Sequence, residues 1–479
     1  MTRERIKTFL LLSLVYISLF LTRKLWIEMP YQIMPLFQKE EISSTNYLFA
    51  DMIKPNKYLL NFDNKNHTIF FNDHNNNLWT STRSFLADVL SSDNIKTEFL
   101  TDEEFSAYNN MKSIVFYFPE KFNSYLLARS LNIAKPNSIP ERIPTIESIY
   151  CYLGRGEPYV VFSEGKRHLK VYNLNIDMKD IKDIVNDIER RGDYTNYYSM
   201  KEALGIDNDI YIPINMSKTM PLIYVENELD VDDIDGIREI AEAFFDKDIE
   251  YLREIIEGNG SILYIYDQRV LKIYQNGLLE YFHPLEAPVR ERNLYISLNT
   301  AAEFLSQHIG VPKDLYISKI EEIEAEEDLG YRLTFKYRIG GMPVILGNPN
   351  IEDFIQIDVF NNYVRNYKRF MRKAMYLTPF NRMDNSSILS AFDIINMDMN
   401  YELLEKVYIE DNGLSIEGIN REELKDQVLS SIDNIALAYL DPCTKKKEEK
   451  LIGVWLIQVG DGIYAFDVYR GNLIFVRNS

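Results

Sequence analysis

The sequence predicts an α+β protein in which an N-terminal transmembrane helix is followed by several small α+β domains with antiparallel sheets. Three observations predict this class. One uninterrupted apolar stretch lies near the N-terminus, short alternating strands are separated by hairpin turn residues, and a strand-turn-strand pattern recurs near the C-terminus. The recurrence predicts that the C-terminal part is a pair of related subdomains.

Residues 6–27 are expected to form a membrane anchor. Arg3, Arg5 and Lys7 precede the apolar core, which predicts a cytoplasmic N-terminus with the bulk of the chain outside. The core, residues 8–22, would be only about 22 Å long as a helix, so a cleaved signal peptide is the alternative. No small-residue cleavage site follows the core, and Trp26 suits a membrane interface. The sequence therefore favours a retained single-pass anchor in the cell membrane.

One face of the predicted anchor carries a stripe that could contact another transmembrane helix. Phe9, Ser13, Tyr16 and Phe20 share this face at helical spacing, whereas Ser18 lies off it. No small-xxx-small pattern accompanies the stripe. A generic anchor with random aromatic content therefore remains an equal alternative.

Composition predicts four regions along the chain. These are the cytoplasmic tip and anchor (1–27), an N-terminal extracytoplasmic α+β domain (28–215), a central helix-plus-meander domain (216–288) and a C-terminal domain of two related subdomains (289–479). In the second region, alternating apolar residues predict strands at 58–62, 68–71, 113–118 and 146–153, a hairpin over 158–172 and a helix over 178–190.

The central region is expected to be one helix followed by three strands. Apolar residues recur at helical spacing from Ile234 to Ile256, and Gly258 and Gly260 end the run. Strands are expected at 261–266, 269–274 and 278–282, and Asn276-Gly277 is a strong hairpin signal between the last two.

The C-terminal region contains a degenerate duplication. Residues 357–364 and 466–473 both read apolar, Asp, Val, aromatic, two turn residues and apolar again, and Asp358 and Asp467 are 109 positions apart (467 minus 358). A helix is expected before each copy, at 300–309 and 422–439. An extra strand is expected in each copy, at 331–339 and 452–459. Gly340-Gly341 suits the turn after the first of these strands because glycine permits positive φ.

Charge and cysteine content exclude some classes of protein. The net charge is −19, with 72 acidic and 53 basic residues, so no nucleic-acid partner is expected. Cys151 and Cys443 are the only cysteines, 292 positions apart, and two separate small apolar side chains are favoured over a disulfide.

Two clusters could hold a metal, and both have a simpler explanation. His67 and His74 lie near Asp63 and Asp73, but an asparagine-rich polar hairpin is favoured there because no ligand spacing matches. The second cluster resembles a calcium loop, with Asp233, Asp235 and Glu242 at ligand positions, yet Val231 occupies the first ligand position. Capping of the following helix by these aspartates is therefore preferred.

No enzymatic motif is found. His168, His283 and His308 are isolated in sequence, and no phosphate loop or nucleophile elbow occurs. No cofactor is expected, and an exported hydrolase remains an alternative supported only by the predicted export.

Two parts of the chain carry motifs typical of a known family. The first is RERIKTFLLL with LTRKLW just beyond the apolar core, and the second is the block 331–369, which contains YRLTFKYRIGGMPV, IDVF and VRNYKRF. With these motifs, the chain resembles the YycH family. The sequence departs from the family in an acidic insert at 321–328 and an asparagine-rich stretch at 72–77. The resemblance implies a single-pass membrane protein of Gram-positive bacteria whose C-terminal part has a YycI-like fold.

The resemblance also implies a function without catalysis. Family members associate with a YycI-like companion protein and the sensor histidine kinase of the two-component system that controls cell-wall metabolism, and they regulate that kinase largely through transmembrane contacts. Gly341, Pro343, Tyr367 and Arg369 match the family-like motif and are expected to define the fold. Whether the kinase is activated or inhibited, and whether the chain forms a homodimer, stay open. An extracytoplasmic module that binds wall fragments or lipid is the alternative.

Overall fold

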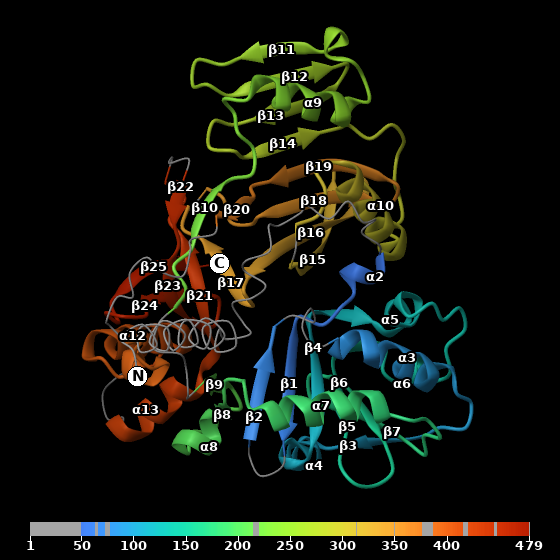
Figure 1. Ribbon diagram of the computed structural model, residues 1–479, viewed down its shortest axis with the longest axis vertical. Coiled ribbons are helices and arrows are strands. Elements are labelled where there is room, and N and C mark those ends of the chain that lie inside the picture. The colour runs from blue at the N-terminus through green and yellow to red at the C-terminus, as the bar shows by residue number, and fades with distance from the viewer. Residues whose placement is uncertain are drawn as a thin grey trace, which may run out of the picture. The chain divides into compact units, whose positions relative to one another are not determined.

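The computed structural model describes residues 49–62, 66–71, 77–213, 220–312, 314–348, 350–375, 387–414, 420–444 and 448–478. Every element described below belongs to one compact unit within residues 42–479 (Figure 1). It is a mixed α+β fold whose sheets are almost entirely antiparallel. This confirms the predicted class of several α+β domains with antiparallel sheets.

The N-terminal half forms a nine-stranded antiparallel sheet, β3-β7-β6-β5-β4-β1-β2-β8-β9. In chain order, its strands are β1 (Lys57–Phe62), β2 (Asn66–Phe70), β3 (Lys96–Leu100), β4 (Ser113–Asn123), β5 (Thr145–Tyr152), β6 (Val160–Glu164), β7 (Arg167–Tyr172), β8 (Tyr197–Ser199) and β9 (Tyr211–Pro213). The four strands, the hairpin and the helix predicted in this region are all present, although the ends differ by a few residues.

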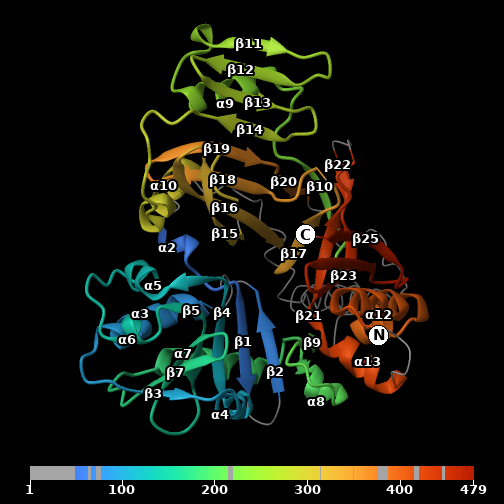
Figure 2. The ribbon, with the colours of Figure 1, turned by 180° about the vertical axis from the view of Figure 1, so that it is seen from behind.

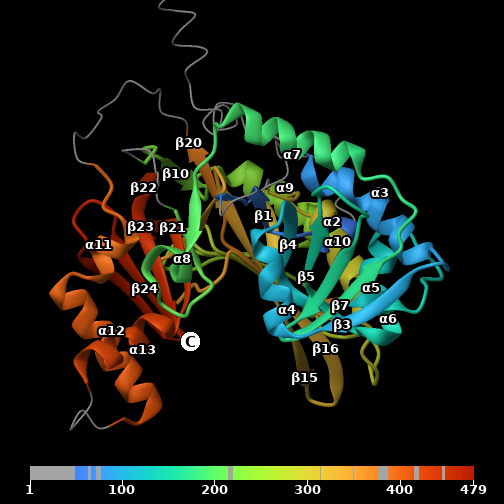
Figure 3. The same cartoon turned by 90° about the horizontal axis from the view of Figure 1, so that it is seen from below.

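Helices cover one face of this sheet (Figure 3). They are α3 (Leu78–Ser91), α5 (Ser124–Ser130), α6 (Ile139–Arg142) and α7 (Lys179–Arg191). Four more short helices of this region are not part of that layer: α2 (Phe49–Met52), α4 (Asp102–Ser106), the 3₁₀ helix η2 (Ala107–Asn110) and α8 (Met200–Leu204). Alternate strand residues such as Leu60, Phe116 and Phe162 are fully buried on the helix side. The other face carries a cluster rich in tyrosine, including Tyr150 and Tyr159.

A second sheet has thirteen strands and is built from three similar modules (Figures 1 and 2). Each module is a helix followed by four strands paired in chain order. The first is α9 (Ile234–Phe245) with β11 (Arg253–Ile256), β12 (Ile262–Tyr266), β13 (Arg269–Ile273) and β14 (Leu279–Phe282). The second is α10 (Leu294–Gln307) with β15 (Leu315–Ala325), β16 (Asp328–Ile339), β18 (Ile355–Phe360) and β19 (Tyr363–Arg369). The third is α13 (Arg421–Ser430) with β21 (Ile432–Asp441), β23 (Ile452–Val459), β24 (Gly462–Asp467) and β25 (Leu473–Asn478).

The modules join edge to edge in two different ways. Strand β14 pairs antiparallel with β19, with Tyr281 opposite Tyr367. The extra strand β17 (Met342–Leu346) follows β16 and pairs parallel with β21. The sheet therefore continues across the expected boundary at residue 288, and the domain limits stay predictions.

A three-stranded sheet and further helices complete the described part. The sheet has the order β20 (Arg372–Met375), β10 (Tyr224–Asn227), β22 (Glu448–Lys450), and the helices are η3 (Ile249–Tyr251), α11 (Ala391–Ile395) and α12 (Asp398–Asn412). None of the described helices is long and apolar enough to cross a membrane. The anchor predicted at residues 6–27, with Phe9, Ser13, Tyr16 and Phe20, lies outside the described residues.

Three predicted helices are wrong in extent. The one expected over 422–439 ends at Ser430, because residues 432–441 instead form β21, which is hydrogen-bonded to β23 along most of its length. The run from Ile234 to Ile256 stops being helical at Asp246, a left-handed C-cap, and continues as η3 and the edge strand β11. Short apolar runs satisfy both periodicities, so tertiary pairing decided between them. The first copy's helix begins six residues earlier than predicted, where Asn293 caps it.

Candidate functional site

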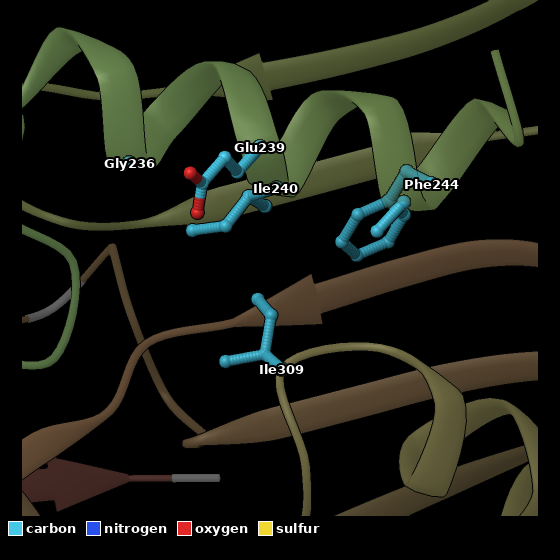
Figure 4. A pocket seen from close by; sticks show the side chains of 6 residues that line it. Gly236, Glu239, Ile240, Phe244 and Ile309 are labelled. Carbon is cyan, nitrogen blue, oxygen red and sulfur yellow. The ribbon is translucent and has the colours of Figure 1, made fainter. Parts of the chain in front are cut away.

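A small pocket lies between α9 and the turn that follows α10 (Figure 4). Its volume is about 180 Å³, and it is lined by Gly236, Glu239, Ile240, Ala243, Phe244 and Ile309. The side chains of Ile240 and Phe244 point from the helix toward Ile309. Sites for drug-sized ligands measure about 300 to 1,000 Å³, so this pocket suits a single apolar side chain.

The floor of the pocket has a strained backbone. Ile309 has a φ of 61°, a left-handed conformation that is a genuine outlier for a β-branched residue. The imidazole of the preceding His308 stacks on Phe304, with ring centroids 4.2 Å apart, and its Nδ1 lies 2.8 Å from the Phe304 carbonyl oxygen. Strain of this kind costs about 1 to 3 kcal/mol and persists only when the surroundings hold it.

Arg369 provides part of that hold. Its Nη1 donates to the carbonyl oxygen of Gly310 at 2.8 Å and to the Tyr367 hydroxyl at 3.2 Å. Its Nε and Nη2 donate to the two carboxylate oxygens of Glu228 at 2.7 and 2.6 Å. Only 1% of the Arg369 side chain is exposed. Its buried guanidinium links β19 to Glu228, the residue that follows β10, and to the strained turn that follows α10.

The structure brings together two of the four motif residues. Tyr367 and Arg369 are in contact beneath the pocket, whereas Gly341 and Pro343 lie at the turn between β16 and β17. Gly340 and Gly341 have φ values of 59° and 82°, which confirms the predicted need for positive φ. Pro343 precedes Val344, where the parallel pairing of β17 with β21 begins.

A second buried arginine joins the three-stranded sheet to the third module. The Nε of Arg372 donates to Asp441 at 3.0 Å, its Nη2 donates to Glu449 at 3.3 Å, and its Nη1 donates to the amide oxygen of Asn227. All three charged side chains are at most 4% exposed. This Arg372 network and the Arg369 cluster were not predicted from the sequence, because Asp441, Glu449, Asn227 and Glu228 lie 69 to 145 positions from the arginines that they bind.

A serine, a histidine and an aspartate line up in the nine-stranded sheet. His168 Nδ1 lies 2.8 Å from Ser163 Oγ, and its Nε2 lies 2.8 Å from Asp102 Oδ1. Ser163 and His168 are cross-strand neighbours in β6 and β7, and both side chains are buried. A nucleophile must be reachable by substrate, so this arrangement is better explained as an internal brace of the hairpin. The sequence expectation of an isolated histidine missed it because Asp102 is 66 residues away.

Of the two clusters considered as metal sites, the structure describes the one around Asp233 and only part of the one around His67. Asp233 caps α9, since its Oδ1 accepts from the Gly236 backbone N–H at 3.2 Å, which confirms the capping interpretation. His67 contacts Asn61 and Glu202, while Asp63, Asp73 and His74 lie outside the described residues. Within the described ranges, no three acidic, histidine or cysteine side chains converge as metal ligands do.

The two cysteines are separate free thiols. Cys151 is fully buried in β5, and burial raises the pKa of its thiol well above the ordinary range. Cys443 is partly buried, and burial together with the Asp441 charge raises its pKa to about 12. Neither thiol is therefore primed as a nucleophile.

Comparisons with known proteins add little. No protein-family model matches the chain, and no curated protein matches it. Among solved structures, the crystal structure of an uncharacterized protein from Eubacterium rectale ATCC 33656 is similar at 14% identity, over 56% of this chain and 85% of that one, with a TM-score of 0.31. A likeness at that level supports no argument about fold or function.

Proposed function

We propose that the chain is a non-enzymatic, membrane-anchored regulator that binds a YycI-like companion protein and a cell-wall sensor histidine kinase and modulates the kinase. The observation that carries the proposal is the family-like sequence of the N-terminal stretch and of residues 331–369. Tyr367 and Arg369 from that block are buried at a joint between segments, as residues that define a fold should be.

The proposed location is the cell membrane, with the N-terminus inside and residues 28–479 outside. The proposed contact with the kinase is the stripe of Phe9, Ser13, Tyr16 and Phe20. Transmembrane helices associate through side-chain packing and interhelical hydrogen bonds, because lipid removes the hydrophobic driving force between them. A stripe with one hydroxyl serine and three aromatic residues offers both.

The test is crosslinking in the native membrane followed by purification of the full chain. Replacing residues 6–27 by a neutral leucine-rich span should remove the kinase and companion protein from the purified sample. Changing Phe9, Ser13, Tyr16 and Phe20 together to leucine should lower recovery about tenfold if contacts worth about 1.4 kcal/mol are lost. Ser18→Leu, off the stripe, is the matched control and should change nothing.

The outcomes separate two parts of the proposal. Undiminished recovery from the replaced span would reduce the anchor to a tether and move the contact to the C-terminal modules. Absence of both partners from the unaltered chain would overturn the regulatory function itself.

The alternative is an extracytoplasmic module that binds a wall fragment or lipid. The pocket beside α9 argues against a large ligand there, since about 180 Å³ holds one side chain. Saturable binding of muropeptides or lipid by the full chain in nanodiscs would favour this alternative. An exported hydrolase would require a carboxylate or histidine whose alanine substitution abolishes turnover in a folded protein.

A further inference from the structure

Two cationic side chains lie close together where the end of β16 approaches the start of β1. Arg338 is the last residue but one of β16, and its Nη1 donates to the carbonyl oxygen of Asn56 at 2.9 Å. Lys57, the first residue of β1, follows Asn56 directly. The two charges are near enough for Arg338 to contribute to the lowered pKa of Lys57. In a chain with a net charge of −19, a pair of adjacent like charges requires an explanation.

Neither cation has an anionic partner within the part of the chain that the structure describes. There, the bond to Asn56 is the only hydrogen bond that Arg338 makes. The Nε of Arg338 is buried, and no described residue supplies an acceptor for it. A buried donor without an acceptor costs about 1 to 3 kcal/mol, and a bound ion or water is one of the few explanations for such a donor in a native protein.

The edge of the guanidinium formed by Nε and Nη2 has a clear preference in this protein. The same edge donates to carboxylate oxygens in four other arginines: Arg238, Arg332, Arg369 and Arg372. Two parallel N–H groups match a carboxylate or a phosphate, both of which offer two oxygens at the right separation. In Arg338 this edge therefore has the geometry of an oxyanion site.

Three aromatic rings surround the two charges. The Nζ of Lys57 lies 4.7 Å from the Tyr117 ring centroid, and the Arg338 guanidinium lies 4.5 Å from that of Tyr316 and 5.0 Å from that of Phe71. These rings displace water without supplying a full negative charge, so the two cations attract an anion more strongly than they would in bulk water. Both side chains are only half-buried, so a small ion can reach them from solvent.

The site carries two positive charges at neutral pH. The guanidinium of Arg338 stays protonated. Burial and, second, the Arg338 charge lower the pKa of Lys57 to about 8, which is still above neutral pH, so its ammonium group remains mostly protonated. A carboxylate would neutralise only one of the two charges, whereas a phosphate monoester carries about −1.5 to −2 at pH 7. The charge of the site therefore favours phosphate.

We propose that Lys57 and Arg338 bind a doubly charged phosphate group, either inorganic phosphate or a phosphate monoester. The Nε and Nη2 of Arg338 donate to two of its oxygens, and the Nζ of Lys57 donates to a third. The bound group supplies the acceptor that Nε lacks and replaces repulsion between two cations by attraction to a shared anion. It thereby links β1 of the nine-stranded sheet to β16 of the second module.

Calorimetric titration of the full chain with inorganic phosphate tests the site. The chain is kept in a maltoside detergent, which contains no phosphate, at about pH 7.5 and at constant ionic strength, because salt screens such contacts. We expect saturable binding of one phosphate per chain with a Kd of about 1 mM or lower. At a phosphate concentration ten times the Kd, the equilibrium constant for unfolding in urea should fall about elevenfold.

Lys57→Met is the decisive variant. Without phosphate it should be more stable than the wild type, because one of two like charges is removed, so a loss of phosphate binding is not caused by unfolding. Phosphate should bind this variant about 10- to 100-fold more weakly, as expected when a charged hydrogen-bond donor is lost. Lys170→Met, whose Nζ lies 2.8 Å from Glu98, is the matched control and should bind phosphate as the wild type does. Any general stabilisation by phosphate as a salt affects all these variants alike.

Two further ligands identify the bound group. Tighter binding of glycerol 3-phosphate than of inorganic phosphate would assign a phosphate monoester, and the reverse order would assign the free ion. Acetate carries a single charge and should bind at least about tenfold more weakly than either. Acetate binding as tight as that of phosphate, no saturable phosphate binding by the wild type, or undiminished binding by Lys57→Met would overturn the proposal.

Discussion

Two places where distant segments meet both bury positive charge, and they treat it differently. At the Arg369 cluster, the guanidinium is matched by both oxygens of Glu228. Where Arg338 of β16 approaches the start of β1, its charge lies close to that of Lys57, and among the described residues no carboxylate forms an ion pair with either side chain. The comparison shows which buried charges require a carboxylate partner and which side chains can instead become neutral by losing a proton.

Aromatic rings replace carboxylates at the second contact. The Lys57 Nζ lies 4.7 Å from the Tyr117 ring centroid, and the Arg338 guanidinium lies 4.5 Å from Tyr316 and 5.0 Å from Phe71. Arg338 Nη1 also donates to the Asn56 carbonyl oxygen at 2.9 Å. Each cation–π contact stabilises the fold by about 0.5 to 2 kcal/mol. This is less than the free energy lost, about 3 to 5 kcal/mol, when one partner of a buried ion pair is removed.

The chemistry of the two side chains explains the difference. An arginine stays charged in proteins, so full burial of its guanidinium, as at Arg369, requires a charged partner, whereas Arg338 is only half-buried and keeps contact with water. A lysine can lose its proton. Burial and, second, the Arg338 charge lower the pKa of Lys57 to about 8. The four predictions below test this contrast.

The largest effect is expected from Arg369→Ala. It leaves Glu228 buried without a partner and frees the strained turn at Ile309, so the free energy of unfolding should fall by about 3 to 5 kcal/mol. Urea denaturation of the purified chain measures the loss. The double variant Arg369→Met with Glu228→Leu removes both charges and should recover most of it. A loss below about 1 kcal/mol in Arg369→Ala would mean that the charge pair is not needed for stability.

Lys57→Met should act in the opposite direction. It removes a buried cation beside Arg338 and should raise the free energy of unfolding by about 1 to 2 kcal/mol at neutral pH. Because the folded pKa is about 8 and the ordinary value is 10.5, wild-type stability should rise between these pH values as the unfolded chain loses its excess proton. In Lys57→Met this rise should disappear.

Lys170 provides the matched control for Lys57. It also lies among tyrosine rings, but its Nζ is 2.8 Å from Glu98, so a partner is present. Lys170→Met should therefore not stabilise the protein. Equal stabilisation by both substitutions would show that the missing carboxylate at Lys57 is not the cause.

Asp233→Ala tests a charge that acts on a helix end rather than on another side chain. Loss of the bond to the Gly236 N–H should lower the free energy of unfolding by about 1 kcal/mol, with fraying at the start of α9. Hydrogen exchange at residues 234–238 reports the fraying. Asp235 is the second residue of α9, and Asp235→Ala should lower the free energy of unfolding by less than Asp233→Ala does. An equal loss in the two variants would argue against capping by Asp233.

The smallest effect is expected from Arg238→Ala. Arg238 binds both oxygens of Glu254 at 3.0 and 3.2 Å, the same bidentate geometry as Arg369 with Glu228. Its side chain is 42% exposed, so water and salt replace the interaction when it is lost. We expect no measurable shift of the urea midpoint. A shift comparable to that of Arg369→Ala would mean that geometry, not burial, sets the cost.

Features with a local cause could be predicted from the sequence. The hairpin at Asn276-Gly277, the positive φ at Gly340-Gly341 and the cap at Asp233 each depend on a few consecutive residues. Alternating apolar residues likewise predicted most strands of the nine-stranded sheet. The general class of the protein followed from these signals.

What the tertiary structure decided depends on residues far apart in the chain. Residues 432–441 became a strand because β17 and β23 offered edges to pair with, although their apolar spacing also fitted a helix. The edge strand β11 made the central region a third module of the same kind, where the duplication alone predicted two. The sequence likewise did not predict three side-chain pairs: Arg369 with Glu228, His168 with Asp102 and His67 with Glu202. Local sequence determines turns, caps and the period of apolar residues, because these depend on neighbouring backbone, whereas the partner of a buried charge depends on which distant strand the packed core places beside it.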